Sequence, residues 1–147
     1  MSVLDITSII AEVRKSGCPQ RLLDIIPYSD FLGATAKIEN EKLVLMLAPR
    51  PSNIGNPSLP AIHGGVVAGF LELTATLELL YTLNIDKFPK VIDFSIDYLR
   101  PARYKATSAS CRVLREGNRL VNASMIAWQE DVESPVATAR CHFLISN

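Results

Sequence analysis

The chain opens with apolar residues at helical spacing and then changes to a strand-like pattern. From about Leu4 to Lys15 the spacing predicts a short amphipathic helix, and a second helical turn is expected over Leu22–Ile26. Two apolar runs, Ala34–Glu39 and Lys42–Leu47, stand on either side of Asn40-Glu41, which predicts a hairpin of two strands. Residues 1–30 are therefore expected to form a helical segment that belongs to the same domain as the strands.

The middle of the chain holds its most apolar stretch. Pro49–Pro60 is dominated by proline, glycine and asparagine and is expected to be a loop with no structure of its own, which is a kind of loop that is often functional. A helix is expected to follow His63-Gly64-Gly65 and to run to about Leu83. Bulky side chains that suit contact with a sheet share one of its faces: Val66, Phe70, Leu73, Leu77 and Leu80. Small side chains, which allow a neighbouring backbone to approach closely, share another face with the charged Glu72: Gly65, Ala68, Gly69, Ala75 and Thr76.

The last third of the chain has the pattern of strands. Val91–Tyr98 alternates with a period of two, Ala106–Leu114 and Leu120–Trp128 flank the turn Glu116-Gly117-Asn118, and Val136–Ile145 is a final strand. A helix that is apolar nearly all round has to be covered on more than one side. One antiparallel sheet of about five to six strands wrapped around a central helix meets that need. This predicts an α+β fold whose helix is partly uncovered in a monomer.

Composition and charge narrow the class of protein. Of the 147 residues, 48% are hydrophobic and 20% are charged, which is typical of one ordered domain over residues 1–147. Lys plus Arg number 15 and Asp plus Glu number 15, so the net charge favours neither nucleic acid nor a membrane surface as a partner. The most apolar stretch carries Glu72, Glu78 and three threonines, which favours a buried helix over a membrane span. No signal peptide is expected, so the expected location is the cytoplasm.

The cysteines and histidines are few and scattered. The number of cysteines is three, and no two of them stand at metal-ligand spacing. The only histidines are His63 and His142, which excludes a zinc site with three histidine ligands. We therefore expect no disulfide framework and no metal, with Cys111 and Cys141 as small core residues.

The segment Pro60-Ala61-Ile62-His63-Gly64-Gly65 stands where the loop meets the central helix. Paired glycines allow backbone amides to come close to a ligand, and the first amides of a helix have no intrahelical partner. Such amides can bind a thioester oxygen and stabilise the negative charge that develops on it. The same glycines are equally compatible with tight packing alone.

Two long motifs, IHGGVVAGFLELTATLELLY and VIDFSIDYLRPAR, together resemble the phenylacetate-degradation-type (PaaI-like) branch of the hotdog-fold acyl-CoA thioesterases. The earlier IPYSDFLGATAKIENEKLVLMLAP resembles the N-terminal helix-to-hairpin stretch of the same family, so the resemblance extends from about Leu22 to the end. It implies a hotdog fold and hydrolysis of an acyl- or aryl-CoA at the interface of a homodimer or a dimer of dimers. It also implies no cofactor, because coenzyme A is part of the substrate.

The resemblance implies roles for individual residues. The backbone amide of Gly64 polarises the thioester carbonyl, and Glu72 of the partner subunit acts as general base or nucleophile. Asn56, or failing that Asn53, positions the carbonyl or the water. By residue type His63 could also be a general base, but it is expected to orient the loop by hydrogen bonds, because in the family the following amide does the chemistry.

Further residues are expected to bind substrate or to be structural. Arg100 and Arg103 suit the phosphates of coenzyme A, although ordinary surface charge explains them equally well. Gly65 and Thr76 lie on the small-residue face and are expected to contact the substrate. Glu78 lies on another face and is expected to be solvated or paired. The basic cluster Arg112, Arg115 and Arg119 has no interleaved aromatic residues, which argues against nucleic acid.

The chain departs from the family pattern at two positions. The acid is usually Asp and here is Glu72, which is expected to be buried among small residues with a raised pKa. A Ser or Thr that helps to hold the water is replaced by Val91, which has no side-chain hydrogen-bonding group. Two alternatives stay open at this point. One is an acyl-CoA-binding protein without catalysis, such as a sensor or a decayed enzyme, and the other is dehydration or hydration of an acyl chain by His63 and Glu72.

Overall fold

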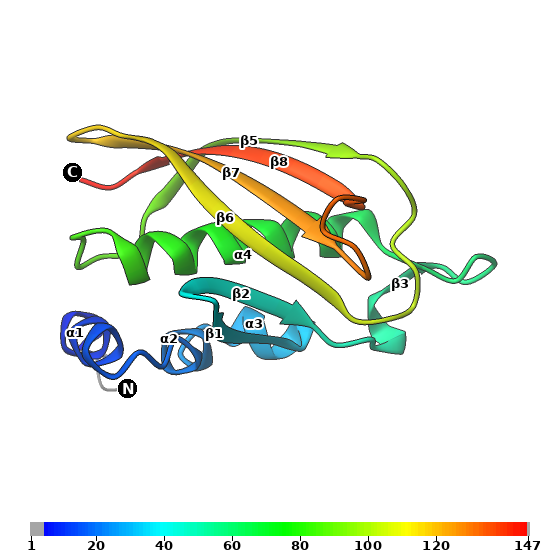
Figure 1. The fold of residues 1–147 in the computed structure, drawn as a ribbon, viewed down its shortest axis with the longest axis horizontal. Coiled ribbons are helices and arrows are strands. Elements are labelled where there is room, and N and C mark those ends of the chain that lie inside the picture. The colour runs from blue at the N-terminus through cyan, green and yellow to red at the C-terminus, as the bar shows by residue number, and fades with distance from the viewer. Residues whose placement is uncertain (1–4, 147) are drawn as a thin grey trace.

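A long helix lies along the inner face of a curved antiparallel sheet (Figure 1). The structure is a computed structural model, and it describes residues 5–146. The helix is α4 (Gly64–Thr82), and the strands of the sheet are β1 (Ala34–Glu39), β2 (Lys42–Leu47), β5 (Lys90–Tyr98), β6 (Thr107–Glu116), β7 (Leu120–Trp128) and β8 (Ala137–Leu144). The six strands stand in the order β1-β2-β6-β7-β8-β5, with every neighbouring pair antiparallel. The predicted α+β fold is confirmed.

The first hairpin has the predicted bounds. Asn40 and Glu41 join its strands with φ of 51° and 66°, the left-handed values that a two-residue hairpin turn needs at both positions. The asparagine suits this conformation, and the glutamate adopts it because the turn is closed on both sides by paired residues.

Helix α4 is covered on two sides, as its composition predicted. It packs against β6 and β7 on one side and contacts α1 (Ile6–Ser16) and α3 (Pro27–Leu32) elsewhere. Of the bulky face, Phe70, Leu73, Leu77 and Leu80 are buried. By length and composition alone α4 is apolar enough to span a membrane, but half of its most apolar window is buried inside the fold, which is the pattern of a core helix.

The N-terminal segment contains one more helix than the sequence predicted. Of the first predicted helix, Leu4 lies outside the described residues, and α1 ends at Gly17, whose φ of 69° closes it. The predicted second turn is α2 (Gln20–Asp24). Pro27 does not end the helical region but begins α3, because proline fits the first turn of a helix, where its missing N–H leaves no bond unmade.

The Pro49–Pro60 segment is not a loop without structure, which corrects the prediction. It contains a 3₁₀ turn, η1 (Pro51–Asn53), and a strand, β3 (Ile54–Asn56), that pairs with β4 (Ala61–Ile62). Gly55 makes this pairing possible, since a Cβ there would lie 2.6 Å from the Cα of His63. The segment is therefore held against the start of α4.

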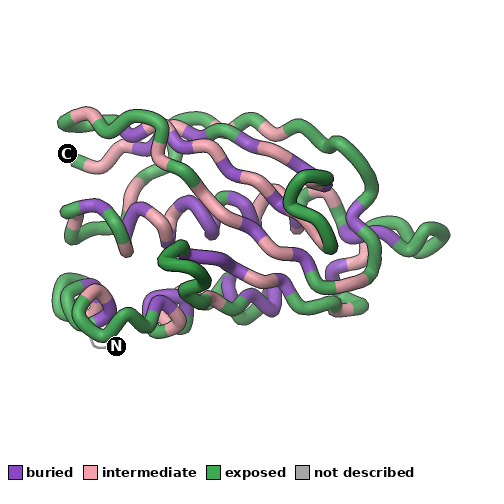
Figure 2. Tube along the Cα trace, in the orientation of Figure 1, coloured by how far each residue is buried: buried purple, intermediate pink, exposed green. Residues whose placement is uncertain are grey.

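The two edges of the main sheet are β1 and β5. Along β5 every residue is exposed or only partly buried (Figure 2). Among these exposed residues are the apolar Val91, Ile92 and Tyr98. An edge strand presents unpaired N–H and C=O groups, so β5 offers both backbone hydrogen bonds and apolar side chains to another chain.

Candidate active site

The start of α4 leaves one backbone amide free. His63 is the N-cap, and its Nδ1 accepts a hydrogen bond of 2.8 Å from the Gly65 N–H. The His63 N–H donates to the Asn53 carbonyl at 2.8 Å, which holds the junction against η1. Within residues 5–146 no hydrogen bond uses the N–H of Gly64. This amide is therefore a donor at the positive end of a 19-residue helix.

The Tyr98 side chain covers the Gly64 position. Its hydroxyl donates a 2.7 Å hydrogen bond to the Gly64 carbonyl, and its ring lies 3.2 Å from where a Cβ on Gly64 would stand. Sequence analysis did not single out Tyr98. The signal was present, because Tyr98 continues the inward-facing series Phe94 and Ile96 on β5, which packs against the core.

A cavity of about 470 Å³ lies beside this junction. Its walls include Gly64, Val67, Tyr98 and Arg100. The cavity therefore brings together the free amide, an apolar wall and one of the two arginines predicted to bind phosphate.

Glu72 is exposed in the single chain, which corrects the expectation of a buried carboxylate. The reason is that the chain's own sheet does not cover this side of α4. Of the small-residue face, Gly65, Ala68, Gly69 and Thr76 are exposed or partly buried, whereas Ala75 is fully buried. Burial, with contributions from the carboxylates of Glu72 and Asp93, raises the pKa of the Cys141 thiol to about 12. Helix α4 contacts β8, and β8 pairs with the edge strand β5.

The two asparagines proposed from the sequence have local partners. Asn53 is buried, and its Nδ2 donates to the Leu32 carbonyl at 2.8 Å. Asn56 is exposed, and its Oδ1 accepts from the Ser58 N–H at 3.0 Å. Both contacts hold the segment before β4 in place. The side-chain amide of Asn53 therefore has a structural role.

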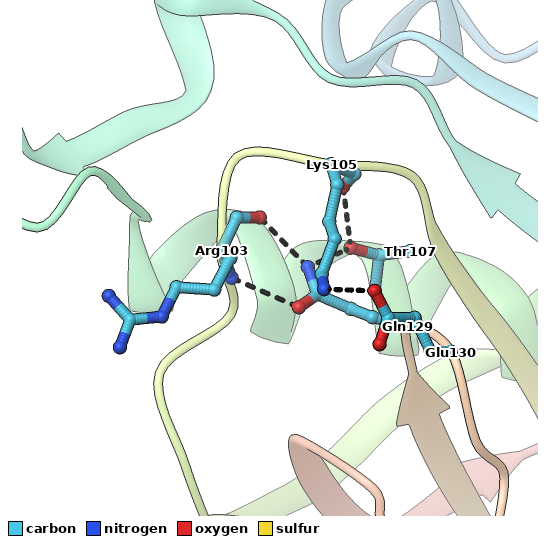
Figure 3. Close-up of polar contacts among 5 residues, drawn as sticks. All are labelled: Arg103, Lys105, Thr107, Gln129 and Glu130. Atoms are coloured by element: carbon cyan, nitrogen blue, oxygen red, sulfur yellow. Dashed lines mark hydrogen bonds and ion pairs between the residues drawn. The ribbon is translucent and has the colours of Figure 1, made fainter.

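The two arginines lie on the connection between β5 and β6. The backbone of Arg103 is clamped by Gln129, whose Nε2 donates to the Arg103 carbonyl at 2.8 Å and whose Oε1 accepts from the Arg103 N–H at 3.1 Å (Figure 3). The Arg103 guanidinium points away from this cluster and donates to the Leu59 carbonyl at 3.3 Å. Arg100 is exposed at the cavity wall. Arg100 is thus available beside Gly64, whereas the Arg103 guanidinium already has a backbone partner.

Glu78 has no ion-pair partner within residues 5–146. It is partly buried on α4, and burial raises its pKa from 4.5 to about 7. Within residues 5–146 no cluster of three or more His, Cys, Asp or Glu side chains is arranged to hold a metal ion.

Comparison with known proteins identifies the family. The sequence profile of the thioesterase superfamily matches residues 59–136, which is more than half of the chain. The chain belongs to the thioesterase superfamily. This thioesterase is 28% identical over 134 residues to the medium/long-chain acyl-CoA thioesterase YigI of Escherichia coli K12, and the match covers 82% of this chain and 86% of YigI.

Solved structures support the same assignment. The thioesterase resembles a crystal structure from Chromobacterium violaceum with a TM-score of 0.76 and 34% identity, over 94% of this chain and 96% of that one. A phenylacetic acid degradation-related protein of Ralstonia eutropha shares the fold, with a TM-score of 0.73 and 20% identity over 86% and 98% of the two chains. The predicted family, hotdog fold and thioester hydrolase activity are confirmed.

Proposed function

We propose that this thioesterase hydrolyses acyl-CoA thioesters in a site that two copies of the chain build together. The observation that carries the proposal is the unbonded Gly64 N–H beside the cavity, with Glu72 on the open face of the same helix. The similarity to YigI, an acyl-CoA thioesterase by name, supports coenzyme A as the thiol part of the substrate.

The Gly64 amide is proposed to bind the thioester carbonyl oxygen. When water adds to the carbonyl carbon, negative charge develops on that oxygen, and a fixed N–H at a helix start stabilises it. The Nδ1 of His63 accepts a hydrogen bond from the Gly65 N–H and leaves the Gly64 N–H free for the carbonyl oxygen. The imidazole instead fixes the geometry of the junction.

Glu72 is proposed to act as general base or nucleophile. As a base, its carboxylate accepts a proton from water while the water oxygen bonds to the carbonyl carbon. The C–S bond then breaks, the sulfur leaves as a thiolate that takes up a proton, and the free acid remains. These groups balance the hydrolysis without a cofactor.

One chain does not bring these two groups together. Gly64 and Glu72 are eight residues apart on α4, which corresponds to roughly 12 Å along the helix axis. Both have to lie within about 3 Å of one reacting group. Two antiparallel copies of α4 meet this requirement, because Gly64 of one copy then lies beside Glu72 of the other.

The surfaces needed for such a contact are open on the chain. Gly65, Ala68 and Thr76 leave part of the small-residue face of α4 open to a second helix, whereas Tyr28 of the same chain packs over Gly69. The β5 edge can continue the sheet into the second copy. The contact would be isologous, with the same patch on both copies. We propose a homodimer or a dimer of dimers on this basis.

Substrate specificity follows in part from the same surfaces. Arg100 and Arg103 are proposed to bind coenzyme A phosphates, while Gly65 and Thr76 on the open face contact the bound molecule. The similarity to YigI favours a medium or long acyl chain over an aryl group.

A second candidate function is binding of acyl-CoA without hydrolysis. The specific observation in its favour is Val91, which is partly exposed on β5 and offers no hydroxyl to hold a water molecule. Thiol release measured beside direct binding, with the same acyl-CoA series, distinguishes the two functions. Binding without any thiol release would select the second.

Glu72→Gln tests the proposed chemistry. We expect an intact fold and a loss of turnover of about 10²–10⁴-fold, as is typical when a general base is removed. His63→Ala should reduce turnover less, because the imidazole supports the junction. Glu133→Gln, at an exposed carboxyl far from α4 in the sequence, is the matched control and should keep full turnover. Full turnover in the Glu72 variant would reject the assignment.

A further inference from the structure

Strands β2 and β6 are paired over only part of their length. The register joins Leu45–Leu47 of β2 to Thr107–Ala109 of β6, and beyond these residues the two strands diverge (Figure 1). A slot of about 700 Å³ opens where they separate, and the C-terminal half of α4 forms part of its wall. This β2–β6 slot has a volume in the range of small-molecule sites. Its apolar lining consists of Leu43, Tyr81, Leu83, Cys111, Val113, Met125 and Ile126.

Glu78 is the charged residue that α4 contributes to the slot. Within residues 5–146 its carboxyl takes part in no hydrogen bond or ion pair, although it is partly buried. Glu78 and Cys111 both line the slot, and burial together with the charge of Glu78 raises the pKa of the Cys111 thiol well above its ordinary range. Partial burial without a partner disfavours the charged form of this carboxyl, so a group that complements its charge would bind favourably beside it.

The slot is separate from the proposed active site. Glu78 comes six positions after Glu72, which places the two side chains roughly 120° apart around the helix. No residue that lines the slot also lines the cavity at Gly64. The proposed hydrolysis therefore makes no use of Glu78.

The charges around the slot favour a cationic ligand. Lys42 and Arg112 line it together with Glu41, Glu116 and Glu78, so ionised Glu78 leaves one negative charge in excess. A carboxylate ligand would add a second anion next to Glu78, and an alcohol would leave the charge uncompensated. An ammonium group supplies both the missing hydrogen-bond donor and the opposite charge.

We propose that the β2–β6 slot binds a small molecule with a hydrocarbon body and one primary amino group, whose ammonium pairs with Glu78. The hydrocarbon packs against Leu43, Val113 and Met125, and the ammonium donates to the Glu78 carboxylate. The site goes beyond thioester hydrolysis and does not depend on the proposed catalytic roles.

Hexylamine, hexanol and hexanoate are suitable probes, because they share one skeleton and differ in the head group. Binding to the full chain is followed by calorimetry and by ¹³C-methyl methionine NMR. Met125 lines the slot, whereas Met46 does not, so the two methyl signals separate binding in the slot from binding elsewhere. At a pH of about 8 we expect hexylamine to shift the Met125 methyl signal and to bind about tenfold more tightly than hexanol. This difference corresponds to one charged hydrogen bond from the ammonium to the Glu78 carboxylate.

Two further measurements decide the role of Glu78. Glu78→Gln should abolish the preference for the amine, while the matched variant Glu133→Gln, at an exposed carboxyl that does not line the slot, should retain it. In the wild-type chain the amine affinity should fall as the pH drops below about 7, because Glu78 then takes up a proton. Equal affinity for the amine and the alcohol, an amine preference that survives Glu78→Gln, or a Met46 shift as large as that of Met125 would overturn the proposal.

Discussion

Replacing Glu78 with Gln should stabilise the folded chain, and the gain should grow with pH. Burial raises the pKa of this carboxyl from 4.5 to about 7, so between these values the folded chain holds a proton that the unfolded chain has released. The stability that depends on this proton is present at low pH and is lost as the pH rises to about 7. Above that pH the folded state carries the full cost of a partly buried carboxylate. Gln has nearly the same shape without the charge, so it removes this cost.

The size of the effect follows from the two pKa values. A pKa of about 7 in place of 4.5 corresponds to about 3 kcal/mol of unfolding free energy at a pH above both. Glu78 opens into the slot, where water still reaches the carboxyl, and this hydration reduces the cost. We therefore expect a gain of about 1–2 kcal/mol.

Urea unfolding of the wild type and of Glu78→Gln, at pH values of about 5 and about 8, measures the gain. The comparison across pH cancels any effect of the amide itself, which does not titrate. Glu116→Gln is the control, because its carboxyl is exposed and should show no such pH-dependent gain. A gain of equal size at both pH values, or the same pH dependence in the control, would refute the reasoning.

Two further predictions concern the junction at the start of α4. Tyr98→Phe removes the hydroxyl that donates to the Gly64 carbonyl. The loss of one hydrogen bond, worth about 1 kcal/mol, should lower kcat roughly fivefold and change KM and thermal stability little. Tyr104→Phe, at an exposed tyrosine, is its control, and unchanged kcat in the Tyr98 variant would remove the positioning role. Joint replacement of Arg100 and Arg103 by Ala should raise KM for acyl-CoA more than it lowers kcat, because the phosphates lie far from the reacting carbon. An unchanged KM would place the phosphates elsewhere.

The fold was predictable from the sequence because its helices and strands have clear hydrophobic periodicity and are separated by turn and capping residues. The first hairpin has the predicted bounds, and the central helix begins at Gly64, within the His63-Gly64-Gly65 segment that it was expected to follow. The missed helix α3 shows the limit of local rules, since Pro27 can end one helix or begin another and only the packing of the segment decides. The pairing of β3 with β4 could not be predicted from the sequence, because it depends on the close approach of the His63 backbone to Gly55.

The candidate site was predictable only where its chemistry is local. The free Gly64 amide follows from a glycine at a helix start, which the sequence displays directly. The environments of the two helix carboxylates did not follow, because Glu72 and Glu78 both stand in an apolar stretch and differ only in what covers them. The chain's own sheet leaves Glu72 exposed, whereas Glu78 is partly buried in the wall of the β2–β6 slot. Burial of this kind is a property of the tertiary arrangement.

The central claim is that the Gly64 amide of one copy and Glu72 of another act on the same thioester. Subunit complementation tests this most directly. Gly64→Val blocks the junction, since even a Cβ there lies 3.2 Å from the Tyr98 ring, and Glu72→Gln removes the acid. Each variant alone should be inactive in an acyl-CoA thiol-release assay. Mixed assemblies of the two should recover activity, because one of their shared sites is intact. Assemblies proven to contain both chains that stay inactive, or an active monomer, would contradict the account.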